Sequence, residues 1–271
     1  MRKSVVLALV ALAGCASEPK KPAEAALEVP KLGGDAAAAP REERGGVRFG
    51  RENARVGQRL RTRVVAKSSW RNPQQELETT VYESEYTIEV LAVLGPAPSR
   101  VRIDFTKNLT FEMGQPSATV IDGKAYVVSV ESPAVVDATT GFVPSPDEIA
   151  RVTDVLPDLG TRAQVDQVLP DDAMRIGESR DALAAAITRI LHPRHWSHER
   201  GTAVLTRADA THAFFEVTLE ARSTSSGMTM AVHGQARVRL SDARLDGFQL
   251  RGKFARPNGE EGDLELSREV F

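Results

Sequence analysis

The chain has 271 residues, a formal net charge of −2 and a single cysteine, Cys15. The chain has no excess of basic residues, whereas a nucleic-acid-binding surface needs one. We therefore expect no nucleic-acid partner. One cysteine excludes a disulfide framework, and the chain is long enough to fold around an apolar core of its own.

The first fourteen residues are typical of a secretory signal. Arg2 and Lys3 precede an apolar run over residues 4–12, and small residues follow this run. The run is too short to cross a bilayer and fits the apolar region of a signal peptide. We therefore predict a signal peptide over residues 1–14. No later stretch of the sequence reaches the ~18 apolar residues of a transmembrane helix.

Residues 12–15, Leu-Ala-Gly-Cys, resemble the lipobox of bacterial lipoproteins. The resemblance implies that the chain is cut before Cys15, and that Cys15 carries a thioether-linked diacylglycerol and a further acyl chain such as palmitate. Two or more long chains attach a protein stably to a membrane. The family also implies a lipid-anchored protein of the cell envelope, and Ala16 fits delivery to the outer membrane. An ordinary secretory signal with a chance cysteine is the alternative.

Residues 16–46 are rich in Pro, Ala, Gly and charges of both signs. Such a segment cannot bury enough apolar surface to offset the entropy lost on ordering. We therefore predict a disordered linker over residues 15–46, which begins at the lipidated Cys15. The globular body is expected over residues 47–271.

Alternating apolar and polar residues in the first half of the body predict β-strands. This alternation is typical of strands with one buried and one solvated face. It covers residues 86–90, 101–106 and 109–113. Farther along, Asp122-Gly123-Lys124 separates two short apolar segments, which predicts a hairpin at this turn.

The middle of the chain carries helix signals. Ser145 is a suitable N-cap, and a proline, two acidic residues and apolar residues at helical spacing follow it. Pro157 should end this helix. A second helix is predicted over residues 178–191, where one apolar stripe runs up to Pro193.

The last third of the chain predicts an antiparallel meander. A long alternating strand covers residues 228–240, and turn residues at 241–244 and 257–259 separate two further alternating strands. Arg239 falls among the solvent-facing positions of this pattern.

Together these elements predict an α+β fold that is mainly antiparallel β, with a curved sheet or sheets and a helical middle segment. Residues 55–58, Arg-Val-Gly-Gln, and residues 175–178, Arg-Ile-Gly-Glu, introduce similar orders of elements. A duplicated half-unit, with halves 47–140 and 170–271, is therefore an alternative to a single unit.

Two resemblances concern the body. Residues 169–179 and the strand, turn and return strand over residues 234–250 resemble uncharacterised β-rich envelope lipoproteins. More distantly, a curved antiparallel sheet around helices resembles the carriers of the outer-membrane lipoprotein localisation system. This second resemblance concerns the fold, which does not by itself define a function.

Three histidines, His192, His195 and His198, lie within seven residues. Imidazoles in such a tract are candidate ligands of a weak zinc or copper site. We favour exposed loop histidines, because Pro193 breaks the helix and no further ligand follows at a suitable spacing. The sequence therefore predicts no metal or other cofactor. His212 and His233 are expected to be solvated.

The sequence lacks a Gly-x-Ser-x-Gly turn, a His-Glu-x-x-His helix and a glycine-rich phosphate loop. We therefore expect no enzymatic activity and name no catalytic residue. The leading hypothesis is a membrane-anchored envelope protein with a binding or envelope-assembly role, whose partner is an envelope protein or a lipid. The alternatives are a carrier of lipid or lipoprotein with an apolar cleft, and a metal-binding envelope protein. An apolar cavity under the sheet favours the carrier.

Overall fold

The computed structural model describes residues 46–72, 74–132, 134–191 and 196–271. The predicted signal peptide and most of the predicted linker, including Cys15, lie outside the described residues. His192 and His195 lie outside them as well.

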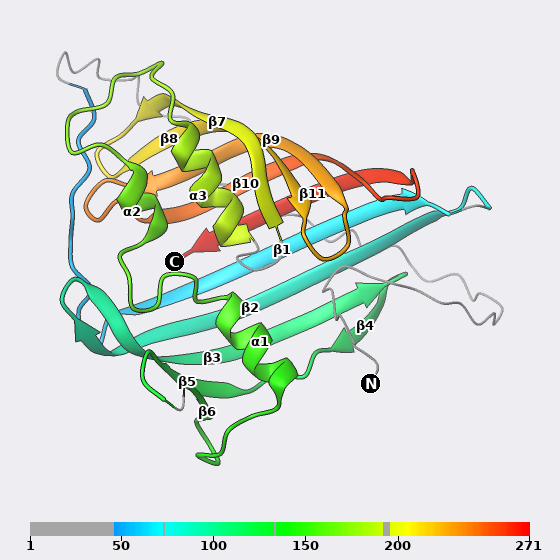
Figure 1. Cartoon of the computed structure of the whole chain (residues 1–271), viewed down its shortest axis with the longest axis horizontal. Coiled ribbons are helices and arrows are strands. Elements are labelled where there is room, and N and C mark those ends of the chain that lie inside the picture. The colour runs from blue at the N-terminus through cyan, green and yellow to red at the C-terminus, as the bar shows by residue number, and fades with distance from the viewer. Residues whose placement is uncertain (1–45, 73, 133, 192–195) are drawn as a thin grey trace.

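One open, curved antiparallel sheet contains every strand of the described residues (Figure 1). Its strands follow the order β6-β5-β3-β2-β1-β11-β10-β9-β8-β7, and β4 pairs with β3. In chain order they are β1 Arg59–Arg71, β2 Leu77–Leu94, β3 Ala97–Glu112, β4 Gln115–Ala118, β5 Ala125–Ser129, β6 Val135–Asp137, β7 Trp196–Ala208, β8 His212–Ser223, β9 Thr229–Arg239, β10 Leu245–Ala255 and β11 Glu261–Val270. Because β11 pairs with β1, the last strand of the chain joins the two halves in the middle of the sheet.

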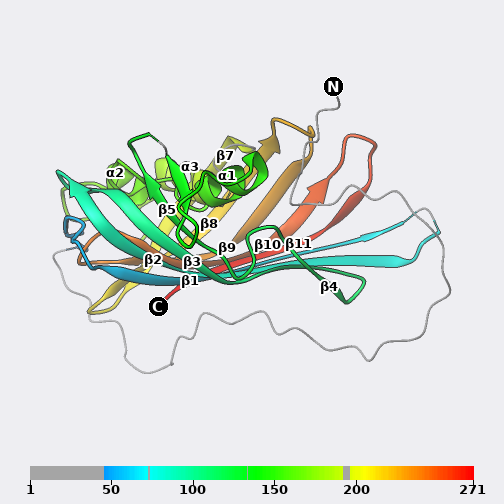
Figure 2. The same cartoon turned by 90° about the horizontal axis from the view of Figure 1, so that it is seen from below.

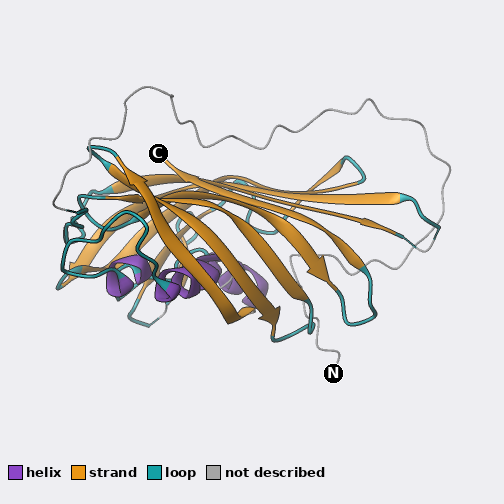
Figure 3. Ribbon diagram, turned by 90° about the horizontal axis from the view of Figure 1, so that it is seen from above, coloured by secondary structure: helices purple, strands orange, loops and turns teal. Residues whose placement is uncertain are grey.

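In the part of the chain that the structure describes, three helices lie on the concave face of this sheet (Figure 2; Figure 3). They are α1 Pro146–Asp154, α2 Gln164–Val168 and α3 Asp181–Leu191. The prediction of a mainly antiparallel β-fold is confirmed, and the helical middle is a minor part of it. No helix of the described residues is long and apolar enough to cross a membrane.

Local sequence signals explain where α1 and α3 begin. The hydroxyl of Ser145 accepts from the backbone N–H of Glu148, and the Glu148 carboxylate accepts from the backbone N–H of Ser145, which makes a capping box. The predicted start of α3 at residue 178 is three residues too early. The backbone of residues 177–180 is engaged by hydrogen bonds to β7, which prevents it from entering the helix.

The predicted hairpin at Asp122-Gly123-Lys124 is wrong. Residues 120–123 form a turn, and the strand that follows, β5, pairs with β3 and β6. The predicted strands 101–106 and 109–113 belong almost entirely to the single strand β3, whose register against β2 shifts at a bulge between them. The predicted meander is confirmed, because β9, β10 and β11 pair in sequence order.

Apolar side chains on the concave face form two separate clusters. One lies beneath α2 and α3 against β7–β10 and includes the fully buried Ile187, Phe215 and Leu250. The other lies beneath α1 against β2, β3 and β5 and includes Ile103 and Tyr126. The central strands β1 and β11 therefore run between two regions of packed helix.

The two similar tetrapeptides adopt the same turn. In residues 55–58 and 175–178, the first backbone N–H donates to the side chain of the fourth residue, at 3.3 and 3.1 Å. The glycine of each turn has a positive φ, 81° and 87°. Its N–H donates to a strand carbonyl, that of Val90 at 2.8 Å in the first turn and that of Leu205 at 2.7 Å in the second. The two turns are thus locally equivalent.

Candidate functional site

A cleft opens on the concave face between α1 and α3, above the central strands β1 and β11. It consists of two cavities of about 150 Å³ and 120 Å³. Both cavities are lined by Val155, Pro157, Ile190 and Arg268, so they adjoin one another. We call the two together the central cleft.

The wall of the larger cavity has an apolar and a polar part. The apolar part comes mainly from α3 and from strands β1 and β9–β11. Its residues include Val64, Ala66, Ile190, Leu191, Met230, Phe248, Leu264 and Leu266. The polar part comes from β2, with Tyr82 and Ser84, and from α1, with Arg151 and Asp154. The cavity is therefore amphiphilic.

The polar groups on β2 are held in place by Asn108, which is fully buried on β3. The Asn108 side-chain amide donates to the hydroxyls of Tyr82 and Ser84, in each case at 2.8 Å. Burial raises the pKa of Tyr82, so its phenol stays protonated at neutral pH. This side of the cleft therefore presents fixed neutral hydroxyl groups.

Arg268 is the charged residue at the centre of the cleft. It lies on β11 directly opposite Val64 of β1 and Phe248 of β10, so its side chain shares the concave face with theirs. Its Nε is buried and has no hydrogen-bond partner. Along β11, Leu264, Leu266 and Val270 alternate with polar residues. An arginine at 268 breaks this alternation, and that break was the sequence signal for this residue.

Two further charged residues, Arg244 and Asp158, line the smaller cavity together with Arg268. The Nη1 of Arg244 is also buried without a hydrogen-bond partner, and its Nε lies 3.8 Å from a carboxylate oxygen of Asp242. Burial raises the pKa of Asp158, although a hydrogen bond from the Gln164 N–H and the charges of Arg268 and Arg244 oppose this rise. Two arginines thus face one acid here, which makes this end of the cleft electropositive.

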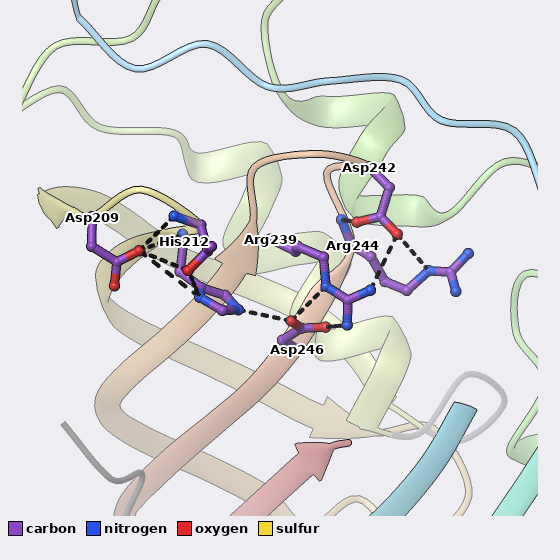
Figure 4. Close-up of polar contacts among 7 residues, drawn as sticks. Asp209, His212, Arg239, Asp242, Arg244 and Asp246 are labelled. Carbon is purple, nitrogen blue, oxygen red and sulfur yellow. Dashed lines mark hydrogen bonds and ion pairs between the residues drawn. The ribbon is translucent and has the colours of Figure 1, made fainter. Parts of the chain in front are cut away.

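A second polar cluster lies where β8 and β10 begin and β9 ends (Figure 4). The Arg239 guanidinium donates to both carboxylate oxygens of the buried Asp246, at 2.6 and 2.8 Å. The His212 Nε2 lies 2.9 Å from the same carboxylate, and the backbone N–H of His212 donates to Asp209 at 2.7 Å. The expectation that Arg239 and His212 are solvated is therefore wrong. Both side chains are partly buried and contact the same Asp246 carboxylate. This network joins β8, β9 and β10.

The Thr211 hydroxyl lies 2.8 Å from Nδ1 of His212. Thr211, His212 and Asp246 therefore form a chain of hydrogen-bonded hydroxyl, imidazole and carboxylate groups. The hydroxyl is also 3.0 Å from the Asp209 carboxylate, and the Asp246 carboxylate is already bound at both oxygens by Arg239. These contacts fix the hydroxyl and neutralise the carboxylate. The arrangement therefore holds strand ends together and is not the basis of a proposed active site.

Of the three weak metal-ligand candidates, only His198 is among the described residues. It lies on β7 and is partly buried, so the expectation of an exposed loop histidine is wrong for this residue. Its Nδ1 lies 3.0 Å from the Thr188 hydroxyl of α3, and burial lowers its pKa. His233 lies exposed on β9. Within the described ranges no group of three His, Cys, Asp or Glu side chains is placed to hold a metal ion. The lipid on Cys15 stays a prediction, and so does the expectation that His192, His195 and His198 form no tight metal site.

Comparisons with known proteins do not place the chain in a family. No family model matches it, and no curated protein matches it. Among solved structures, it is similar to the COG4313 outer membrane channel from Pseudomonas putida F1, with 10% identity over 81% of this chain and 97% of the channel. The TM-score of 0.20 is too low for a shared fold to be argued.

Proposed function

We propose that this protein is a non-enzymatic carrier that holds a hydrocarbon chain in the central cleft. The observation that carries the proposal is the pair of adjoining cavities beneath an open, curved sheet. Ligand sites are concave and mostly apolar, with a few placed polar groups, and the larger cavity has this composition. The sequence leaves this carrier as an alternative to a binding or envelope-assembly role, and an apolar cavity under the sheet is the feature that favours it.

The proposed location of this carrier is the cell envelope. Lipid on Cys15 would tether the body to the envelope, in the outer membrane if the lipobox and Ala16 act as they do in the family they resemble. A flexible coil of about 30 residues holds its ends roughly 30 Å apart on average. The cleft would then reach a lipid surface or a neighbouring envelope protein, and these are the proposed donor and acceptor of the ligand.

Blocking the cleft tests the proposal. Ala66 lies on β1 in the wall of the larger cavity, opposite Leu266 of β11, so an Ala66→Phe ring would occupy the cavity. Thr218→Phe, at an exposed position on β8, is the matched control. The full chain is purified, examined by native mass spectrometry for bound lipid, stripped of lipid and titrated with 1-dodecanol in a calorimeter.

We expect lipid to co-purify with the wild type, and dodecanol to bind the wild type and Thr218→Phe equally. Ala66→Phe should lose at least tenfold in affinity and retain the circular-dichroism spectrum of the wild type. Binding that is unchanged in Ala66→Phe, or that is absent from the wild type, would contradict the carrier.

A further inference from the structure

We infer that the central cleft selects a single-chain amphiphile with an anionic head, and that Arg268 is the residue that binds this head. The inference rests on the proposed carrier function and adds the chemical class of its ligand.

Arg268 places a charged side chain on an otherwise apolar part of the sheet. It is partly buried on the concave face opposite Val64 and Phe248, where its Nε is shielded from water. Within the described residues its side chain forms no hydrogen bond or ion pair, and its buried Nε is unsatisfied. A buried polar group without a partner is rare in native proteins and calls for a functional explanation. An anion from outside the chain supplies the missing partner.

Four other charged residues of the described chain line the cleft around Arg268. Arg244 also lines the smaller cavity and also has a buried guanidinium nitrogen without a partner. Asp158 is the one acid in that wall, and burial shifts it toward its neutral form. On the opposite side, α1 contributes one positive and one negative residue, Arg151 and Asp154, to the wall of the larger cavity. The cleft therefore carries an excess of positive charge that favours an anion.

The position of Arg268 and the size of the two cavities restrict the shape of the ligand. Arg268 lines both cavities, so a head bound there leaves the apolar wall of the larger cavity for the hydrocarbon chain. An apolar cavity of about 150 Å³ is the size that holds one benzene molecule. Two adjoining cavities of this size accommodate one extended chain and are too small for the two chains of a diacyl lipid.

The guanidinium of Arg268 restricts the chemistry of the head that it binds. A guanidinium is planar and donates two parallel hydrogen bonds to a carboxylate or a phosphate, which makes it more selective than an ammonium group. The ligand class is therefore a long-chain carboxylate or a single-chain phosphate. A free fatty acid and a lysophospholipid are two sources of these heads.

Three probes with the same chain separate these possibilities: dodecanoate, dodecyl phosphate and the neutral 1-dodecanol. Each is titrated by calorimetry into the lipid-free full chain, its Arg268→Met and Arg268→Lys variants, and Arg251→Met. Methionine retains an unbranched apolar side chain and removes the charge. Arg251 is exposed on β10, so Arg251→Met controls for the loss of one positive charge.

We expect an anionic probe to bind the wild type at least tenfold more tightly than dodecanol. Arg268→Met should remove this preference and leave dodecanol binding unchanged, Arg268→Lys should retain part of it, and Arg251→Met should behave as the wild type. Whichever anionic probe binds more tightly identifies the head as carboxylate or phosphate.

Equal affinity for dodecanoate, dodecyl phosphate and dodecanol would overturn the anion site and leave the carrier intact. A preference for anions that persists in Arg268→Met would overturn the role of Arg268. Failure of all three probes to bind the wild type would contradict the carrier itself. Melting curves confirm that each variant is folded.

Discussion

The guanidinium of Arg239 forms two hydrogen bonds with the carboxylate of Asp246, which is only 3% exposed. His212 contacts the same carboxylate from β8. One buried acid therefore holds together the ends of three neighbouring strands, at positions where the sequence pattern indicated solvent.

Asp246→Asn should destabilise the protein by about 3 kcal/mol, because it leaves the partly buried Arg239 without its counter-charge. The free energy of unfolding in urea measures this change. Asp263→Asn, at an exposed position on β11, is the control and should change stability by less than about 0.5 kcal/mol. Similar small effects of both variants would show that the network contributes little to stability.

Arg268→Met should raise the stability of the lipid-free protein by about 1 kcal/mol, because it removes a partly buried charge whose Nε has no hydrogen-bond partner. Thermal unfolding measures the change. Arg251→Met should leave the melting temperature unchanged within error. A clear loss of stability in Arg268→Met would mean that the guanidinium is already satisfied within the folded chain.

The lowered pKa of Glu148 predicts that the folded protein loses stability in acid. This pKa is lowered from 4.5 to about 2, chiefly by a hydrogen bond from Lys124 and then by hydrogen bonds from Ser145. Because the folded-state pKa lies below the unfolded value, the carboxylate stabilises the fold above pH 4.5 and loses this effect as pH falls toward 2.

Urea unfolding of the wild type and Glu148→Gln from pH 7 to pH 2 checks this prediction. The difference between the two should be constant above pH 5 and should shrink below it. Glu216→Gln, at an exposed position on β8, should stay within about 0.5 kcal/mol of the wild type throughout. A difference for Glu148→Gln that does not vary with pH would rule out the proposed linkage.

Phe49 should mark where the folded body begins. Its ring is 6% exposed and stacks on Phe215 with centroids 6.3 Å apart, so Phe49→Ala should cost about 3 kcal/mol. Phe142→Ala, at a ring that is 76% exposed, is the control and should have little effect.

Truncation tests the same boundary. A chain that starts at Gly46 should have the same melting temperature as the full chain, whereas deletion through Arg51 should lower it. Equal melting of all three chains would contradict this boundary.

Cys15→Ser should abolish lipid attachment, because the lipobox resemblance assigns the thioether to this thiol. Cells that express the full chain are labelled with a clickable fatty acid and fractionated. We expect the wild type to carry label in the membrane fraction and the variant to carry none. Label and membrane association that persist in Cys15→Ser would refute the lipobox prediction.

The sequence by itself determined the local elements of this protein. The alternation over residues 228–240 and the Ser145 capping signals correctly predicted β9 and α1, because both depend on residues close in the chain. The predicted hairpin at Asp122-Gly123-Lys124 failed because a turn signal indicates where a chain bends and does not identify the strand that pairs with it.

Only the tertiary structure decided which strands meet and what the cleft contains. Val64 and Arg268 are paired across the middle of the sheet although about two hundred residues separate them, and no local pattern specifies such a partner. No local pattern specifies how the helices meet either. Ile190 at the end of α3 and Val155 at the end of α1 line one cleft because the sheet curves beneath these two helices. The alternation of a strand assigns each side chain to a face, and long-range pairing then decides which side chains on that face form a site.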